Sequence, residues 1–94
     1  MDQPHALLLD ALIGQVVVVD MASTYVCLGT LAAYDRDFLE LVDADLHDLR
    51  DSKKNRETYV FDSVRFGIRR NRARVLVRRD EMVAITRFAD ISES

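Results

Sequence analysis

Apolar residues recur along the chain in short runs, and the first of these runs predicts a helix. Pro4 suits the first helical turn, where Asp2 or Gln3 can act as the cap, and Gly14 suits the left-handed residue that follows a helix. The intervening segment carries one wide apolar face, formed by Leu8, Leu9, Ala11, Leu12 and Ile13. A helix of about ten residues is unstable alone, so we expect it to lie on the rest of the protein.

The next three apolar runs favour strands. Four consecutive valines at 16–19 predict a strand over residues 15–21 that is covered on both faces. A second strand is expected over Tyr25–Tyr34, in which Gly29 indicates a sharp bend or a close approach of another backbone segment. A turn at the acidic residues 35–37 then leads to a half-exposed third strand over residues 38–45.

The long segment at about 46–74 allows two interpretations. Asp51 or Ser52 would cap a helix over residues 53–66 that ends at Gly67, and its apolar residues fall at helical spacing. Residues 58–61 also have good strand propensity. We predict the helix and keep the strand as the alternative.

The chain ends with two short strands, at 74–78 and 82–88, around a tight turn at 79–80. Five strands with a bent second member predict a mainly β fold, a strongly curved sheet or small open barrel, with an N-terminal helix and an extra helix in the long loop. The length of 94 residues corresponds to one domain, 1–94, with an insertion at about 46–74.

Charge is unevenly distributed, although the net charge is only −3. Six acids and one arginine lie between positions 35 and 48, whereas seven arginines and no acid lie between 65 and 79. Such a division of charge allows three interpretations. The arginines attract a polyanion, they pair with the acids of a neighbouring subunit, or they belong to a solvated polar loop. The insertion also combines arginine with tyrosine and phenylalanine, which is typical both of RNA-facing surfaces and of protein interfaces.

Other chemistry finds little support. Cys27 is the single cysteine, so a disulfide or a thiolate metal site within one chain is excluded. We expect its side chain to be packed in the core. His47 is expected to be a solvated loop histidine rather than a metal ligand. No phosphate-binding loop, nucleophile motif, signal peptide or membrane-spanning run is recognised, so we expect no enzyme activity, no cofactor, no membrane partner and a cytoplasmic location.

Several stretches, in this order, resemble the Sm-like (LSm) family. The end of the first helix and first strand of that family resemble Leu12-Ile13-Gly14 and residues 16–20. The first Sm motif resembles Gly29-Thr30-Leu31, Tyr34-Asp35 and residues 39–44. The second motif, usually Arg-Gly-Asp-Asn followed by apolar residues, resembles Val77-Arg78-Arg79-Asp80-Glu81-Met82-Val83. The resemblance covers about 7–46 and 73–88, and the insertion between them is longer than such loops usually are.

The resemblance implies a bent five-stranded antiparallel sheet capped by the helix. It also implies a homo-oligomeric ring of six or seven subunits, in which the fourth strand of one subunit pairs with the fifth of the next. Apolar edge strands at 75–77 and 83–85 would need such cover in any case. Head-to-tail contacts of this kind close into rings.

The chain departs from the RNA-binding pattern of the family. RNA-binding relatives carry an asparagine in the loop after the second strand, and none stands at 35–38. Arg79 replaces the glycine of the second motif, and Glu81 replaces its asparagine. Arg78 remains suited to stacking on a base, and Phe38 stacks likewise unless it belongs to the core or an interface.

We therefore expect a ring that binds single-stranded RNA or an RNA-associated partner, with contacts shifted toward the arginines. The alternative is a ring scaffold without a nucleic-acid role. The candidate RNA-binding residues are Asp37, Phe38, Arg69, Arg70, Arg72, Arg78, Arg79 and Asp80.

Overall fold

The computed structural model describes residues 6–92 and contains two helices and five strands among them. In chain order these are α1 (Ala6–Asp10), β1 (Val16–Met21), β2 (Tyr25–Tyr34), β3 (Phe38–Asp48), α2 (Arg56–Phe66), β4 (Arg72–Arg78) and β5 (Met82–Arg87). Short 3₁₀ turns lie at Leu49–Asp51, Arg79–Glu81 and Phe88–Asp90.

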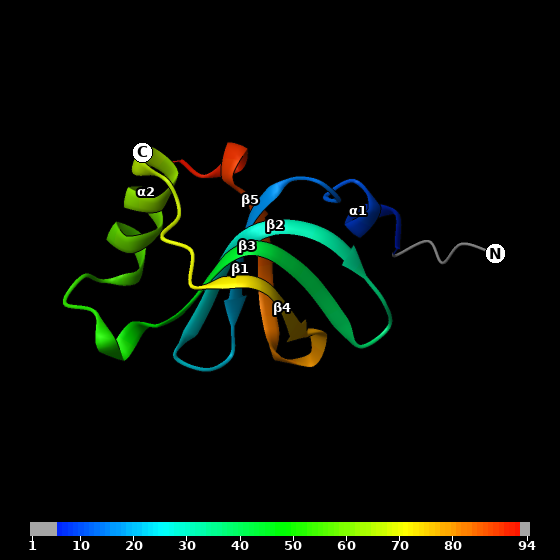
Figure 1. Cartoon of the computed structure of the whole chain (residues 1–94), viewed down its shortest axis with the longest axis horizontal. Helices are drawn as coiled ribbons and strands as arrows, with labels where there is room; N and C mark the ends of the chain where they lie inside the picture. The colour runs from blue at the N-terminus through cyan, green and yellow to red at the C-terminus, as the bar shows by residue number, and fades with distance from the viewer. Residues whose placement is uncertain (1–5, 93–94) are drawn as a thin grey trace.

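The five strands form one bent antiparallel sheet in the order β4-β3-β2-β1-β5 (Figure 1). Leu39 of β3 faces Val77 of β4, and Val19 of β1 faces Ile85 of β5. The sheet is not closed, because β4 and β5 do not pair with each other and so form its two edges. The predicted fold class, a strongly bent five-stranded sheet with an N-terminal helix and a further helix in the long loop, is confirmed.

The bend lies where β2 and β3 change register. Leu28 faces Asp45 and Thr30 faces Val42, so two residues of β3 are opposite Gly29 alone. This is a β-bulge, and Asp43 within it has a positive φ of 50°. A Cβ on Gly29 would lie 3.0 Å from the Cβ of Ala44 and 3.1 Å from the carbonyl oxygen of Val42. The close backbone approach predicted at Gly29 is therefore present.

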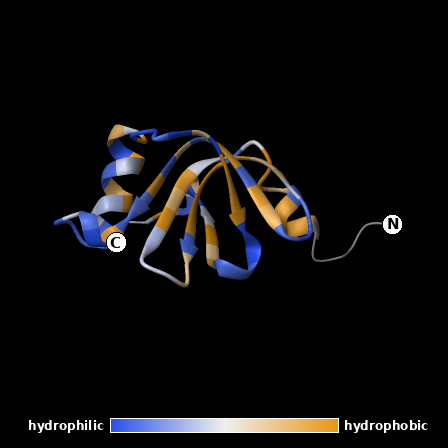
Figure 2. Cartoon of the chain, turned by 60° about the horizontal axis from the view of Figure 1, so that its bottom comes forward, coloured by the Kyte–Doolittle hydropathy of each residue, from blue (hydrophilic) through white to orange (hydrophobic). Residues whose placement is uncertain are grey.

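Apolar side chains pack on both faces of the sheet, as the four valines predicted. Figure 2 shows how these residues gather along the strands. One cluster of buried residues consists of Leu9, Val17, Val19, Cys27, Leu31, Leu39, Leu41, Ala44 and Val77. The second lies under α2 and consists of Val18, Val26, Leu28 and Val60. Since neighbouring residues of a strand point to opposite faces, Val18 packs beneath α2 while Val17 and Val19 join the other cluster.

The first helix is shorter than predicted. It ends at Asp10, and a turn continues the chain to Gly14, whose φ is the left-handed 84° that we expected. The N–H of Gly14 donates to the carbonyl of Leu31 at 2.7 Å, which ties this turn to β2. Leu9 is buried but Leu8 is 78% exposed, so the apolar face is only partly covered. The predicted cap and proline at positions 2–4 lie outside the described residues.

The predicted helix in the insertion is present, and the strand alternative at 58–61 is wrong. The helix begins at Arg56 rather than 53, because its cap is Asn55, whose side chain accepts the N–H of Thr58 at 2.9 Å. The predicted caps Asp51 and Ser52 lie in the preceding turn. Gly67 ends the helix with a φ of 100°, as predicted.

Strands β3 and β4 both extend into the segment that we assigned to the insertion. β3 continues to Asp48, three residues beyond the prediction, and β4 begins at Arg72 instead of 74. The side chain of Asn71 accepts the N–H of Leu46 at 2.9 Å and donates to its carbonyl at 3.0 Å. This pair of bonds prolongs the contact between the two strands in a way that local propensity does not reveal.

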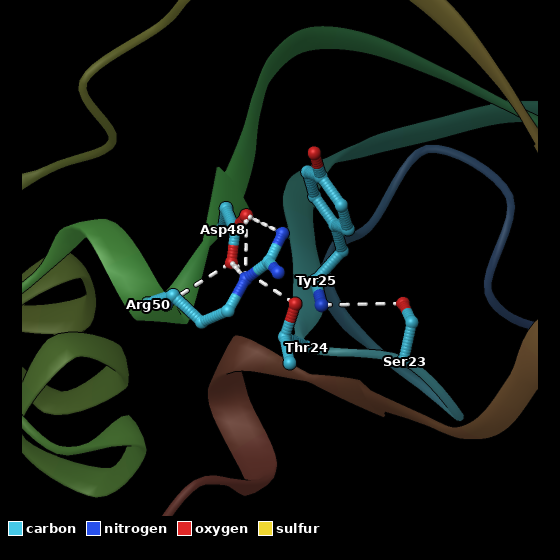
Figure 3. A network of polar contacts seen from close by, with 5 residues as sticks. All are labelled: Ser23, Thr24, Tyr25, Asp48 and Arg50. Atoms are coloured by element: carbon cyan, nitrogen blue, oxygen red, sulfur yellow. Dashed lines mark hydrogen bonds and ion pairs between the residues drawn. The ribbon is translucent and has the colours of Figure 1, made fainter.

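A polar network joins the β1–β2 turn to the end of β3 (Figure 3). The carboxylate of Asp48 accepts the hydroxyl of Thr24 at 3.0 Å and the backbone N–H of Arg50 at 3.0 Å, and it forms an ion pair with the Arg50 guanidinium at 2.7 Å. In the same turn, the hydroxyl of Ser23 accepts the N–H of Tyr25 at 3.2 Å. Hydrogen bonds from Arg50, followed by that from Thr24, hold the pKa of Asp48 well below its usual range.

We expect Gly29→Ala to destabilise the protein. Overpacking against the bulge costs about 1–3 kcal/mol, which exceeds the roughly 0.4–1 kcal/mol that alanine contributes by restricting the unfolded chain. The free energy of unfolding, measured by urea denaturation, should therefore fall by about 1–2 kcal/mol. Ala32→Val, at an exposed position of the same strand, should change it little. Equal stability of the two variants would contradict the close approach.

We also expect Asp48→Asn to weaken the dependence of stability on acid pH. Because the folded-state pKa of Asp48 is lowered, its contribution is complete above the unfolded value of about 3.9. That contribution is lost as the pH falls toward the folded-state pKa. Melting temperatures recorded by circular dichroism between about pH 2 and pH 7 should fall less steeply for this variant, from a lower starting point. Asp51→Asn, in the adjacent turn, is the matched control; the same slope for Asp48→Asn and the wild type would disprove the role of the network.

Candidate nucleic-acid interface

Two turns meet at one end of the sheet and bring five of the predicted residues together. The N–H of Arg79 donates to the carbonyl of Asp37 at 2.8 Å, and its guanidinium donates to the carbonyl of Asp35 at 2.6 Å. The β4–β5 turn is thereby held against the β2–β3 turn. A hollow of about 470 Å³ lies between them and is lined by Arg36, Asp37, Phe38, Arg78, Arg79 and Asp80.

The β2–β3 turn is stabilised by its own first carboxylate. Asp35 accepts the N–H groups of Asp37 at 2.9 Å and Phe38 at 2.8 Å, as aspartate does in tight turns. These two bonds lower the pKa of Asp35, so the side chain stays ionised in the turn. Its acceptor oxygen is therefore already engaged by the backbone.

The planar groups around this hollow differ in how they are held. The guanidinium of Arg78 forms an ion pair with Asp80 at 2.7 Å, but both side chains are about two-thirds exposed. Phe38 is 37% exposed. The guanidinium of Arg79 also lies over the ring of Tyr34, 5.7 Å from its centroid. Arg79 thus positions the turns, while Phe38 and Arg78 present surfaces on which a base can stack.

The other three predicted residues lie at the opposite end of the sheet, between α2 and β4 (Figure 1). Arg70 forms an ion pair with Asp43 at 3.5 Å, and Arg72 donates to the carbonyl of Asn71 at 3.0 Å. Arg69 has no ion-pair partner within residues 6–92. The structure therefore divides the predicted contacts into two separate groups.

Sequence reasoning missed a second hollow, of about 720 Å³, beside α2. Its lining includes Asp45, His47, Tyr59, Phe66, Arg69 and Arg70. The arginine and aromatic content of the insertion was a signal for this site. No feature of the sequence indicated which strand residues would face the insertion. The expectation of a solvated loop histidine is wrong, because His47 belongs to β3 and its ring stacks on Tyr59 with centroids 4.3 Å apart.

A buried carboxylate, that of Asp45, forms part of the polar lining of this hollow. Asp45 is only 6% exposed and accepts a hydrogen bond from the hydroxyl of Tyr59. Burial, followed by this carboxylate, raises the pKa of Tyr59 well above its usual range. Burial likewise raises the pKa of Cys27 to about 12, so its side chain remains a thiol and packs in the core as predicted.

Neither a metal cluster nor a membrane span is found within the described part of the chain. Between residues 6 and 92, no three histidine, cysteine, aspartate or glutamate side chains gather as a metal site would require. No helix in that range is both long and apolar enough to cross a bilayer.

Comparisons with known proteins rest on structure alone, since no family model and no curated protein matches the sequence. An Sm protein from Pyrococcus abyssii, solved with a uridine heptamer, is 17% identical over 92% of this chain and 99% of its own, with a TM-score of 0.60. An Sm-like protein from Archaeoglobus fulgidus is 18% identical over 93% and 96%, with a TM-score of 0.57. An LSm protein from Methanococcus vannielii is 22% identical over 92% and 99%, with a TM-score of 0.56. The protein therefore has the Sm-like fold over nearly its whole length.

Proposed function

We propose that the protein forms a homo-oligomeric ring of six or seven subunits that binds single-stranded RNA in the cytoplasm. The observation that carries this proposal is the meeting of the two turns around Phe38 and Arg78, in a fold shared with a protein solved with bound uridine heptamer. A stacking surface flanked by guanidinium groups suits an unpaired base.

The two free edges of the sheet support the ring. β4 exposes Leu76 to 46% and β5 exposes Val83 to 70%, and both strands leave one side of their backbone unpaired. Apolar edges of this kind associate with other strands unless they are covered. Pairing β4 of one subunit with β5 of the next covers both, and this head-to-tail contact closes into a ring.

The arginines between α2 and β4 support an RNA ligand rather than a role in assembly. If they served acids of a neighbouring subunit, those acids would need to be free. Asp43 is paired with Arg70, Asp45 accepts Tyr59, and Asp48 is held by Arg50. These three acids are thus already engaged within their own subunit, which favours an external anion as the partner of the arginines.

The second candidate is a ring scaffold that binds no nucleic acid. Ion pairs within the chain favour it, because they reduce the positive charge available to phosphate. Arg74 pairs with Glu40 and Arg78 pairs with Asp80, in addition to the pair between Arg70 and Asp43. The two candidates differ in their response to oligonucleotide and salt.

We expect Val83→Lys to dissociate the ring and leave the subunit folded. A charge at this edge position opposes strand pairing with a neighbour, and because Val83 is 70% exposed the change removes little buried apolar surface. Light scattering after size exclusion should show a fall from ring to monomer mass, with unchanged circular dichroism. Phe66→Ser, on α2 away from both edges, should retain the ring mass. A monomeric wild-type protein at micromolar concentration would exclude the ring.

We expect Arg69→Ala/Arg70→Ala/Arg72→Ala to weaken RNA binding and flatten its salt dependence. Each phosphate neutralised on a single strand contributes about −0.7 to the slope of log K against log salt, so three losses reduce the slope by up to about 2. Fluorescence anisotropy with a labelled uridine heptamer provides the measurement. The ring mass should not change, and Lys53→Ala controls for a lost charge elsewhere. An intact wild-type ring that binds no heptamer at low salt would establish the scaffold instead.

A further inference from the structure

The hollow beside α2 is bounded by two parts of the chain. They are the end of β3 and the stretch at 52–71, which runs through the loop before α2, the side of α2 that carries Tyr59 and Ser63, and the return toward β4. Its volume of about 720 Å³ lies within the range of small-molecule sites. It lies at the opposite end of the sheet from the two turns, so it is a separate place for a ligand (Figure 1).

One wall of the hollow offers an exposed aromatic ring. Phe66, the last residue of α2, is 79% exposed, and the guanidinium of Arg65 lies 5.4 Å from its ring centroid. A phenylalanine beside an arginine is a platform on which any base can stack.

The rim of the hollow carries a cation without a partner in the described chain. Two carboxylates and three cations line the site, but Asp62 pairs with Lys54 and Asp45 accepts Tyr59. Arg69 is left for an anion. The two hydrogen bonds between Asn71 and Leu46 fix residues 69–71 against β3, so Arg69 is presented from an anchored segment.

Two stacked rings, those of His47 and Tyr59, also line the hollow. His47 lines the hollow, and its Nε2 is buried without a hydrogen-bond partner in residues 6–92. Stacking on Tyr59, with the two rings inclined by only 12°, holds the imidazole in place.

From these features we propose that the hollow beside α2 binds a nucleotide unit, with its base on Phe66 and its phosphate on Arg69. The bound unit belongs to an RNA strand or is a free nucleoside monophosphate. Both present a base and a phosphate, so the same two side chains recognise either. The RNA form rests on the function proposed above and gives each subunit a second contact, remote from the two turns.

The test uses the intact wild-type ring and two single variants. Calorimetry measures binding of three free ligands: uridine monophosphate, adenosine monophosphate and the nucleoside uridine. Anisotropy measures binding of the uridine heptamer. Phe66→Leu should weaken binding of each ligand by about fivefold or more, because stacking on an aromatic ring is lost. Phe66→Tyr should restore it. Arg69→Gln should weaken binding of the monophosphates but not of uridine, which lacks the phosphate.

Tyr25→Leu is the matched control, since it removes a 38% exposed aromatic ring that lines neither the hollow beside α2 nor the two turns, and it should leave binding of every ligand unchanged. If the heptamer binds but Phe66→Leu and Arg69→Gln alter nothing, the nucleotide site is wrong and the proposed function stands. If monophosphates bind in a Phe66-dependent manner but the heptamer does not, the site is a free-nucleotide site and the RNA function fails. Absence of all binding, or a changed ring mass in Phe66→Leu, would overturn the site and assign the hollow to a protein contact.

Discussion

The close approach of β2 and β3 at Gly29 is the constraint on which the rest of the structure depends. Two residues of β3, Asp43 and Ala44, lie opposite one residue of β2, and a Cβ there would lie only 3.0 Å from the Cβ of Ala44. A bulge increases twist and bends the strand that contains it. The sheet curves at this point, and its inner face encloses the larger of the two clusters of buried residues.

The insertion covers the second face of the sheet beneath α2, so that both faces of the sheet are buried there. Val60 of α2 packs on Val18, Val26 and Leu28, so residues that would face solvent in a simple curved sheet are buried. Because α2 must lie over this face, the arginines that follow it are carried away from the turns. The physical separation of the two groups of cations is thus a consequence of apolar burial rather than of electrostatics.

Local ion pairs change what the asymmetric charge distribution means. Part of each charged stretch lies on β3 or β4, and the antiparallel pairing of these strands places Arg74 beside Glu40. Arg70, just before β4, reaches Asp43 of β3 in the same way. Exposed pairs of this kind contribute little to stability, about 0–1 kcal/mol each. They do, however, decide which guanidinium groups remain for a ligand, and Arg69 is one of these.

The sequence by itself determined the order and type of the elements. Valine runs, Gly29 and the helix signals around Gly67 act locally, through backbone sterics and the period of apolar residues, and these were sufficient to predict the bent sheet and α2. Only the tertiary structure decided that β3 continues to Asp48, that His47 stacks on Tyr59, and that Arg69 lines the same hollow as these two rings. Each of these depends on contacts between residues far apart in the chain, such as the bonds of Asn71 to Leu46, and local propensity carries no information about such contacts.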